Sequence, residues 1–133
     1  MSLLYTSLVA ADFIETVNFY EDYFGFAPVV EQESYVFMQD PENPVNAIAI
    51  FAQDHPCLKG RMMPSNGVIL NIASHDIAGM YDHLYHEGVD VFKEPGTDIE
   101  GRKHFVISDP NGILVNIYDA SSSNRREREL EAA

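Results

Sequence analysis

Hydrophobic and polar positions follow the same order twice along this chain of 133 residues. An apolar run at 4–10 leads into a segment at 12–25 with apolar residues at helical spacing, and a run at 68–73 leads into a similar segment at 76–88. Each segment opens with an aspartate, which caps helices well, and ends at a glycine, which can adopt the left-handed conformation that terminates them. The repetition predicts a strand and then a helix in each half of the chain.

Each helical segment is followed by three short extended runs bounded by turn-forming residues. These runs lie at 28–32, 34–39, 46–52, 89–93, 103–108 and 113–119. In both halves an Asp-Pro pair, beginning at Asp40 and at Asp109, precedes the last run, where proline suits a tight reversal. We therefore predict an α+β fold of two tandem βαβββ modules, at about 4–52 and 67–119, joined by a connector at 53–66.

The length of the chain fits a single domain, because a chain of this size can bury most of its unfolded surface without disulfides or a structural metal. We place this domain at 1–119. Beyond it the apolar pattern stops, and residues 120–133 are predicted to be a charged tail with little apolar surface to bury. The single cysteine, Cys57, belongs to no zinc-binding pattern and cannot form a disulfide within the chain.

Charge and hydropathy exclude several classes of partner. With 21 acidic and 8 basic residues, the formal net charge is −13, which repels nucleic-acid phosphates and anionic membrane surfaces. No apolar run approaches the ~20 residues needed to span a bilayer. The N-terminal sequence has neither a basic region nor a long apolar segment before a cleavage site. We therefore expect a soluble, cytoplasmic protein that binds neither nucleic acid nor membranes.

Two local sequences carry a resemblance to a known family. They are NFYEDYFGF at 18–26 and FVISDPNGILVN at 105–116. Within the duplicated βαβββ plan, they make residues 4–119 similar to the vicinal oxygen chelate family, which includes glyoxalase I, bleomycin resistance proteins, fosfomycin resistance enzymes and extradiol dioxygenases. The resemblance implies a curved, mixed sheet that forms a cup, with the helices outside and a ligand cavity on the concave side. It also implies a homodimer.

The same resemblance identifies four positions at which metal-dependent members of the family hold their ion. The ligands there are histidines or glutamates on the first and last strands of each module. In this chain the four positions carry Tyr5, Ala49, Ile69 and Asn116. Isoleucine and alanine cannot coordinate a metal, and tyrosine and asparagine are weak ligands, so this set could not retain a divalent transition ion. We therefore predict no metal site and no cofactor.

Alternation along the strands separates residues that pack beneath the helices from residues that face the cavity. Large apolar side chains such as Phe105 and Ile107, together with Leu4 and Leu8, are assigned to the helix side. The polar residues assigned to the cavity are predicted to bind a ligand, and they are Tyr5, Ser7, Asn71, His104, Asn116 and Tyr118. A concave, mostly apolar site with a few convergent polar groups is typical of small-molecule recognition.

His104 is the candidate catalytic acid or base among these residues, because imidazole exchanges a proton near neutral pH. A lone histidine is more often a hydrogen-bonding wall residue, so three functions stay open. The preferred one is a metal-independent small-molecule-binding protein of the glyoxalase/bleomycin resistance type. The second is a metal-free lyase or isomerase that uses His104, and the third is a regulatory or structural dimer with a vestigial cavity. The residues leave undecided whether the protein is an enzyme, with lyase, isomerase or dioxygenase-like chemistry.

Overall fold

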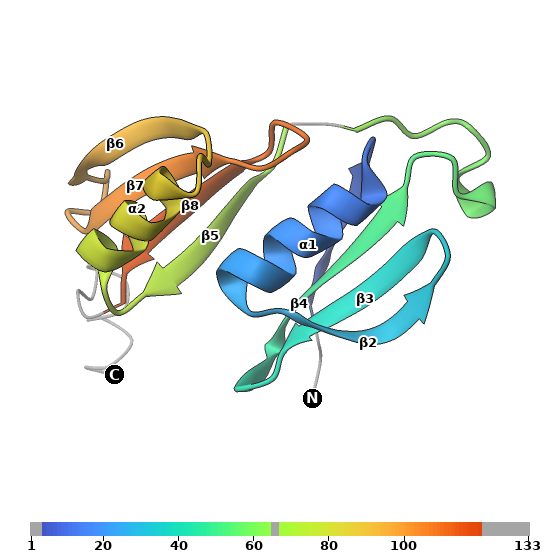
Figure 1. Ribbon diagram of the computed structural model, residues 1–133, viewed down its shortest axis with the longest axis horizontal. Helices are drawn as coiled ribbons and strands as arrows, with labels where there is room; N and C mark the ends of the chain where they lie inside the picture. Colours follow the sequence, from blue (N-terminus) through green and yellow to red (C-terminus); the bar gives the residue numbers. More distant parts are fainter. Residues whose placement is uncertain (1–3, 65–66, 121–133) are drawn as a thin grey trace. The chain divides into compact units, whose positions relative to one another are not determined.

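The computed structural model describes residues 4–64 and 67–120 of the chain (Figure 1). The chain divides into two compact units, Met1–Asn66 and Gly67–Ala133, and this division falls at the end of the predicted connector. Within the described residues, each unit has a strand, an α-helix and three further strands, in that order, and its four strands form one mixed sheet. This confirms the predicted α+β fold and its two βαβββ modules. Of the predicted tail, all but Ala120 lies outside the described residues.

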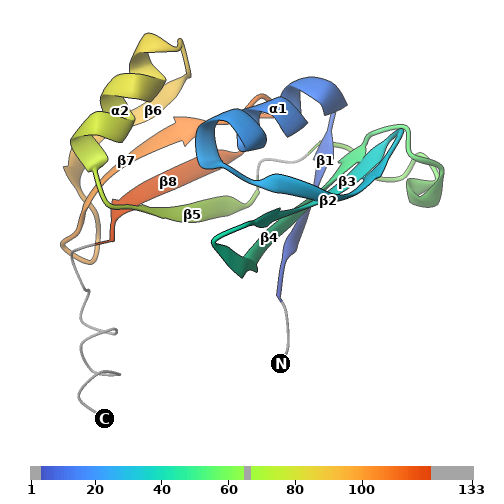
Figure 2. The same ribbon diagram turned by 60° about the horizontal axis from the view of Figure 1, so that its bottom comes forward.

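The first unit builds its sheet in the strand order β1-β4-β3-β2. Its elements are β1 (Thr6–Ala10), α1 (Phe13–Phe24), β2 (Ala27–Gln32), β3 (Tyr35–Asp40) and β4 (Asn43–Ala52). β1 runs parallel to β4, and the other neighbouring strands are antiparallel. α1 packs over β4, on one face of this sheet (Figure 2). A short 3-10 helix at Pro56–Leu58 lies within the connector.

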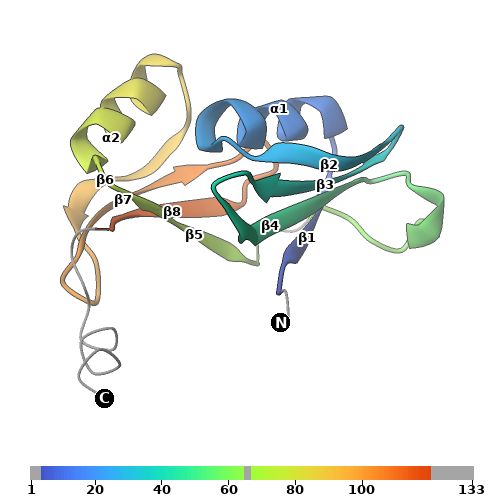
Figure 3. The same ribbon diagram turned by 90° about the horizontal axis from the view of Figure 1, so that it is seen from below.

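The second unit repeats this arrangement in the strand order β5-β8-β7-β6. Its elements are β5 (Ile69–Ser74), α2 (Ile77–His86), β6 (Val91–Thr97), β7 (Lys103–Ser108) and β8 (Leu114–Asp119). β5 runs parallel to β8, and the other neighbours are antiparallel. α2 packs against β7 and β8 and so covers one face of the sheet (Figure 3).

Both helices have the caps that the sequence predicts. The Asp12 carboxylate accepts a hydrogen bond from the backbone N–H of Glu15 at 3.0 Å, and the Asp76 carboxylate accepts one from the N–H of Gly79 at 3.0 Å. Each bond satisfies a backbone N–H that has no partner within the helix. After α1, Gly25 takes a φ of 72°, in the left-handed region. Among the described residues, no helix has the length and apolar character needed to cross a membrane.

Two strands extend beyond their predicted bounds. β4 begins earlier than expected, at Asn43, because Pro41 and Glu42 suffice for the reversal before it. β6 continues to Thr97 although it contains Pro95. The reason is that β6 is an edge strand with two shifts of register against β7, and edges and bulges are where a sheet tolerates proline.

The core of the second unit lies between α2 and the two central strands of its sheet. Six of its side chains are at most 2% exposed, namely Leu84, Phe105, Ile107, Ile113, Val115 and Ile117. This confirms the face assigned to the large apolar residues of β7 and β8. In the first unit Leu8 is buried as expected, but the assignment of Leu4 to the helix side is wrong. Leu4 is 92% exposed, because β1 begins only at Thr6.

Candidate functional site

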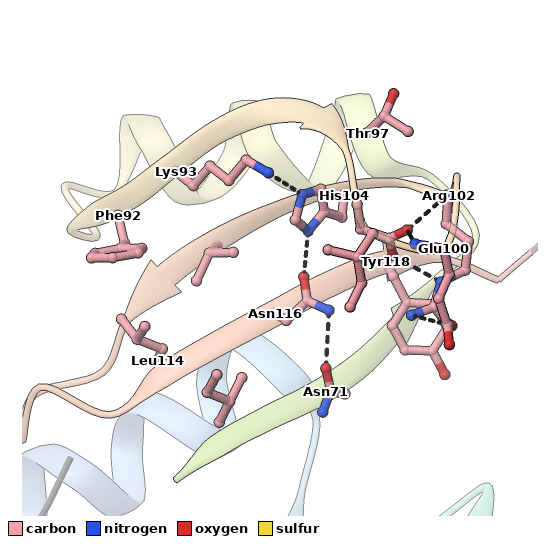
Figure 4. Close-up of a pocket in the computed structure, with 14 residues that line it drawn as sticks. Asn71, Phe92, Lys93, Thr97, Glu100, Arg102, His104, Leu114, Asn116 and Tyr118 are labelled. Carbon is pink, nitrogen blue, oxygen red and sulfur yellow. Dashed lines mark hydrogen bonds and ion pairs between the residues drawn. The ribbon is translucent and has the colours of Figure 1, made fainter. Parts of the chain in front are cut away.

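A pocket of about 710 Å³ opens on the face of the second sheet opposite α2 (Figure 4). Strand alternation explains which residues reach it. Phe105 points toward α2, where its ring lies 5.2 Å from that of Tyr81, so the neighbouring His104 and Val106 point the other way, into the pocket. The apolar part of the lining consists of Ile69, Phe92, Ile99, Val106 and Leu114.

Four polar side chains in this pocket form one hydrogen-bonded series, here called the polar chain. Lys93 Nζ lies 2.8 Å from His104 Nε2, and His104 Nδ1 lies 2.7 Å from Asn116 Oδ1. Asn116 Nδ2 then donates to Asn71 Oδ1 at 3.0 Å. Figure 4 shows the series running across the sheet from β6 to β5. It joins all four strands of the unit through their side chains.

The ammonium group of Lys93 fixes which atoms donate and which accept along the polar chain. An ammonium group has only donors, so Lys93 donates and His104 Nε2 accepts. The proton of the imidazole then lies on Nδ1 and is donated to the Asn116 carbonyl oxygen, which leaves the Asn116 amide nitrogen to donate to Asn71. His104 is therefore a neutral imidazole with both ring nitrogens engaged, and its side chain is buried, with the residue 6% exposed.

The register of the sheet brings these side chains together. Asn71 on β5 stands directly opposite Asn116 on β8, and His104 on β7 stands opposite Tyr118, two residues along β8 from Asn116. Such diagonal neighbours on one face are within reach of a long side chain. β6 shifts register on both sides of Lys93, and bulges of this kind redirect a side chain.

At one end of the pocket, Arg102 is held by two acidic residues; these three residues are here called the Arg102 cluster. Arg102 Nε lies 2.9 Å from an Asp98 carboxylate oxygen, and Nη2 lies 3.4 Å from Glu100. The guanidinium carbon also sits 4.1 Å from the centre of the Tyr118 ring, in a cation–π contact. The positive charge of Arg102 is thus contacted by two carboxylates and one aromatic ring of the protein itself.

The environment of Asp98 favours its ionised form. Burial alone raises the pKa of the Asp98 carboxyl, but hydrogen bonds from the backbone N–H and guanidinium of Arg102 and from the backbone N–H of Glu100, with the charge of Arg102, outweigh it. The net result is a pKa lowered from its ordinary value of 3.8. Asp98 therefore stays charged and keeps Arg102 in place.

The substitution Asp98→Asn should reduce the free energy of unfolding by about 1–2 kcal/mol near neutral pH, because it replaces a charged acceptor by a neutral one. A group whose pKa is lowered by folding contributes stability that is fully present above its unfolded pKa and lost as pH falls through its folded pKa. The difference between wild type and variant should therefore hold down to about pH 4 and shrink below it. Urea denaturation across this pH range measures the difference.

Glu100→Gln is the matched control for this prediction. Its ion pair with Arg102 is longer, at 3.4 Å, and the side chain is 27% exposed, so its loss should change stability by less than about 1 kcal/mol. A difference between wild type and Asp98→Asn that stayed constant or grew toward low pH would contradict the role given to Asp98.

Four of the six residues predicted to bind ligand line this one pocket, namely Asn71, His104, Asn116 and Tyr118. Tyr5 and Ser7 belong to the first unit and are not in its lining. There Tyr5 makes an edge-to-face contact with Phe37, with the ring centres 5.0 Å apart, and Ser7 lies exposed on β1. The role of all six in ligand binding stays a prediction.

Sequence reasoning missed three charged residues of the lining, Lys93, Asp98 and Glu100. Lys93 falls at the predicted end of its strand, and the bulges of β6 break the alternation that would have assigned it to the cavity face. Asp98 and Glu100 could have been identified from the sequence, because Asp98, Glu100 and Arg102 stand at intervals of two residues.

The residues present do not fit the metal site of the family. Among the described residues, no group of three or more His, Cys, Asp or Glu side chains is placed to hold an ion. Of the four positions considered, Ala49 and Ile69 have no donor atom in their side chains. The Asn116 side chain is committed to His104 and Asn71.

Comparison with known proteins supports the fold. Three solved structures resemble this chain at 16–18% identity and over 90% of its length. A superfamily member from Sphaerobacter thermophilus DSM 20745 has a TM-score of 0.71 and 97% of its chain covered. A lactoylglutathione lyase from Agrobacterium tumefaciens has a TM-score of 0.67 and 93% covered. A glyoxalase-related enzyme from Fulvimarina pelagi has a TM-score of 0.72 and 88% covered.

Sequence comparison gives the family. No curated protein matches the chain. A family model, described as Glyoxalase/Bleomycin resistance protein/Dioxygenase superfamily, matches residues 2–117, which is nearly the whole chain outside its tail. This chain belongs to the glyoxalase/bleomycin resistance protein/dioxygenase superfamily.

Proposed function

We propose that this protein is a metal-independent small-molecule-binding protein and that its ligand occupies the pocket of the second unit. The observation that carries the proposal is the combination of an apolar wall with the polar chain from Lys93 to Asn71. A pocket of about 710 Å³ is within the size range of small-molecule sites, and its few polar groups are fixed in direction. Because they are already ordered, a ligand binds without the entropy loss of arranging them.

The geometry of His104 favours binding over catalysis. Both ring nitrogens are engaged, and the residue is only 6% exposed. For Nε2 to take a proton from a substrate, the Lys93 ammonium would first have to leave it. His104 is better suited to hold Lys93 in position than to serve as the acid or base of a lyase or isomerase.

Pocket occupancy can be tested with a metabolite and antibiotic library in a thermal-shift assay. A ligand that binds only the folded state stabilises it by about 2.7 kcal/mol at a hundred times its Kd. We expect compounds that raise the midpoint of the wild type equally with and without EDTA. Binding that EDTA abolishes would contradict metal independence.

A matched pair of variants locates the binding site. Ile69 lines the pocket and is 57% exposed, so the larger side chain of Ile69→Trp should obstruct part of the pocket without disturbing the core. Ile14 is 64% exposed on α1, in the other unit, and Ile14→Trp is its control. The midpoint shift should disappear in Ile69→Trp and persist in Ile14→Trp. Equal shifts in both variants would place the ligand elsewhere.

We further propose a cytoplasmic homodimer that has neither nucleic acid nor a membrane as partner. The formal net charge of −13 supports the second part, because it repels polyanions and anionic bilayers. Homodimers are what the family resemblance implies. Light scattering of the purified protein should give twice the mass of the chain, and a monomer at all concentrations would overturn this assignment.

A further inference from the structure

Lys93 brings a positive charge into the pocket that no carboxylate neutralises there. Its Nζ contacts the neutral imidazole of His104 at 2.8 Å, and among the described parts of the chain it takes part in no ion pair. The charge of the adjacent Glu94 acts on α2, across the sheet from the pocket. There the pKa of Tyr81 is raised, first by burial and then by the negative charge of Glu94. An ammonium group has three N–H donors, and His104 uses one of them.

The other charged side chains of the lining pair with one another in the Arg102 cluster. Asp98 and Glu100 both pair with Arg102, and Tyr118 covers its face. This cluster has one more negative than positive charge, whereas Lys93 is paired with none. The pocket is therefore polarised, with its cationic group on β6 and its acidic groups already bound to Arg102.

We propose that the ligand is a small carboxylate with an apolar body, and that Lys93 binds its carboxylate. This rests on the proposed function, that the pocket holds a small molecule. Charge-assisted hydrogen bonds from the two remaining Lys93 donors would bind the carboxylate. Phe92 and Leu114, both in the lining, would contact the apolar body. His104 is a positioning residue, because its Nε2 fixes the direction of the ammonium group.

Matched probes separate the charge of a ligand from its shape. The first triplet is phenylacetate, phenylacetamide and phenethylamine, and the second is hexanoate, hexanamide and hexylamine. Binding is followed by NMR through the side-chain amide signals of Asn71 and Asn116. We expect each carboxylate to bind roughly tenfold or more tightly than its amide, since a hydrogen bond to a charged group is worth more than a neutral one. The affinity should fall as salt is added.

Three variants test the role of Lys93. Lys93→Gln removes the charge but keeps an N–H donor, and it should weaken carboxylate binding about tenfold while leaving amide binding unchanged. Lys93→Arg keeps the charge and should restore most of the affinity. Lys103→Gln makes the same change of net charge on β7, and it should have little effect, because Lys103 does not line the pocket but a neighbouring cavity beside α2 that shares Thr97 and His104 with it. Thermal melts establish that each variant is folded.

The outcomes distinguish this inference from the proposed function. If carboxylates and amides bind equally and Lys93→Gln changes neither, the ligand class is wrong but the pocket remains a binding site. If the amines bind most tightly, the Arg102 cluster rather than Lys93 recognises the ligand, which also overturns the inference. If no probe at millimolar concentration perturbs the signals of Asn71 and Asn116, the inference fails, whereas the proposed function is decided separately by the library screen with Ile69→Trp and Ile14→Trp.

Discussion

Replacing Phe105 by alanine is expected to lower the free energy of unfolding by about 3–5 kcal/mol, the largest loss of the substitutions considered. Phe105 is completely buried on β7, between the strands β6 and β8, and its ring meets Tyr81 of α2 edge-on. The sheet on one side and the helix on the other prevent the cavity from closing, so both the transfer free energy and the packing contacts are lost. Urea denaturation gives the magnitude.

Phe92→Ala is the control for the Phe105 experiment, because it makes the same substitution on the adjacent strand. Phe92 is 67% exposed, so its truncation should reduce stability by less than about 1 kcal/mol. Amide hydrogen exchange in β7 and β8 should accelerate in Phe105→Ala and stay near the wild-type rate in Phe92→Ala. Similar losses for the two variants would show that the core is not where the structure places it.

The second large effect is expected for Asp109→Ala, which should lower the free energy of unfolding by about 2–4 kcal/mol. Asp109 is 5% exposed and begins the turn between β7 and β8. One carboxylate oxygen accepts hydrogen bonds from the backbone N–H groups of Asn111 at 2.8 Å and Ile113 at 2.9 Å. Alanine leaves both donors without this acceptor, and Ile113 is itself buried.

Asp109→Asn isolates the hydrogen bonds from the charge. The asparagine carbonyl oxygen can accept both backbone donors, so the loss should be about 1 kcal/mol or less by urea denaturation. Equal losses for the alanine and asparagine variants would contradict this explanation and assign the effect to the charge instead.

The fold was predictable because local signals and the repeat agree. Asp12 and Asp76 cap helices, the strands that follow alternate or are continuously apolar, and the same order occurs twice. The strand bounds were less accurate where proline interrupts the pattern. The run predicted at 89–93 stops short of Pro95, whereas β6 continues through it to Thr97, because an edge strand with bulges accommodates proline.

The candidate site was predictable only in part, for reasons of geometry. His104 lies on β7 and Asn116 on β8, two regular strands where alternation assigns faces correctly. Lys93 lies on an irregular strand, where alternation fails. The pairing of Arg102 with Asp98 depends on how a loop folds back on itself, and neither strand nor helix periodicity describes a loop.

The irregularity of β6 also affects how readily another chain could pair with this edge of the sheet. A regular strand at the edge of a sheet offers a row of free backbone groups to which another chain can add a strand. β6 contains Pro95, which has no N–H to offer, and its two register shifts interrupt the straight edge that such pairing requires. The strand that carries Lys93 into the pocket is thereby a poor template for intermolecular β-sheet growth.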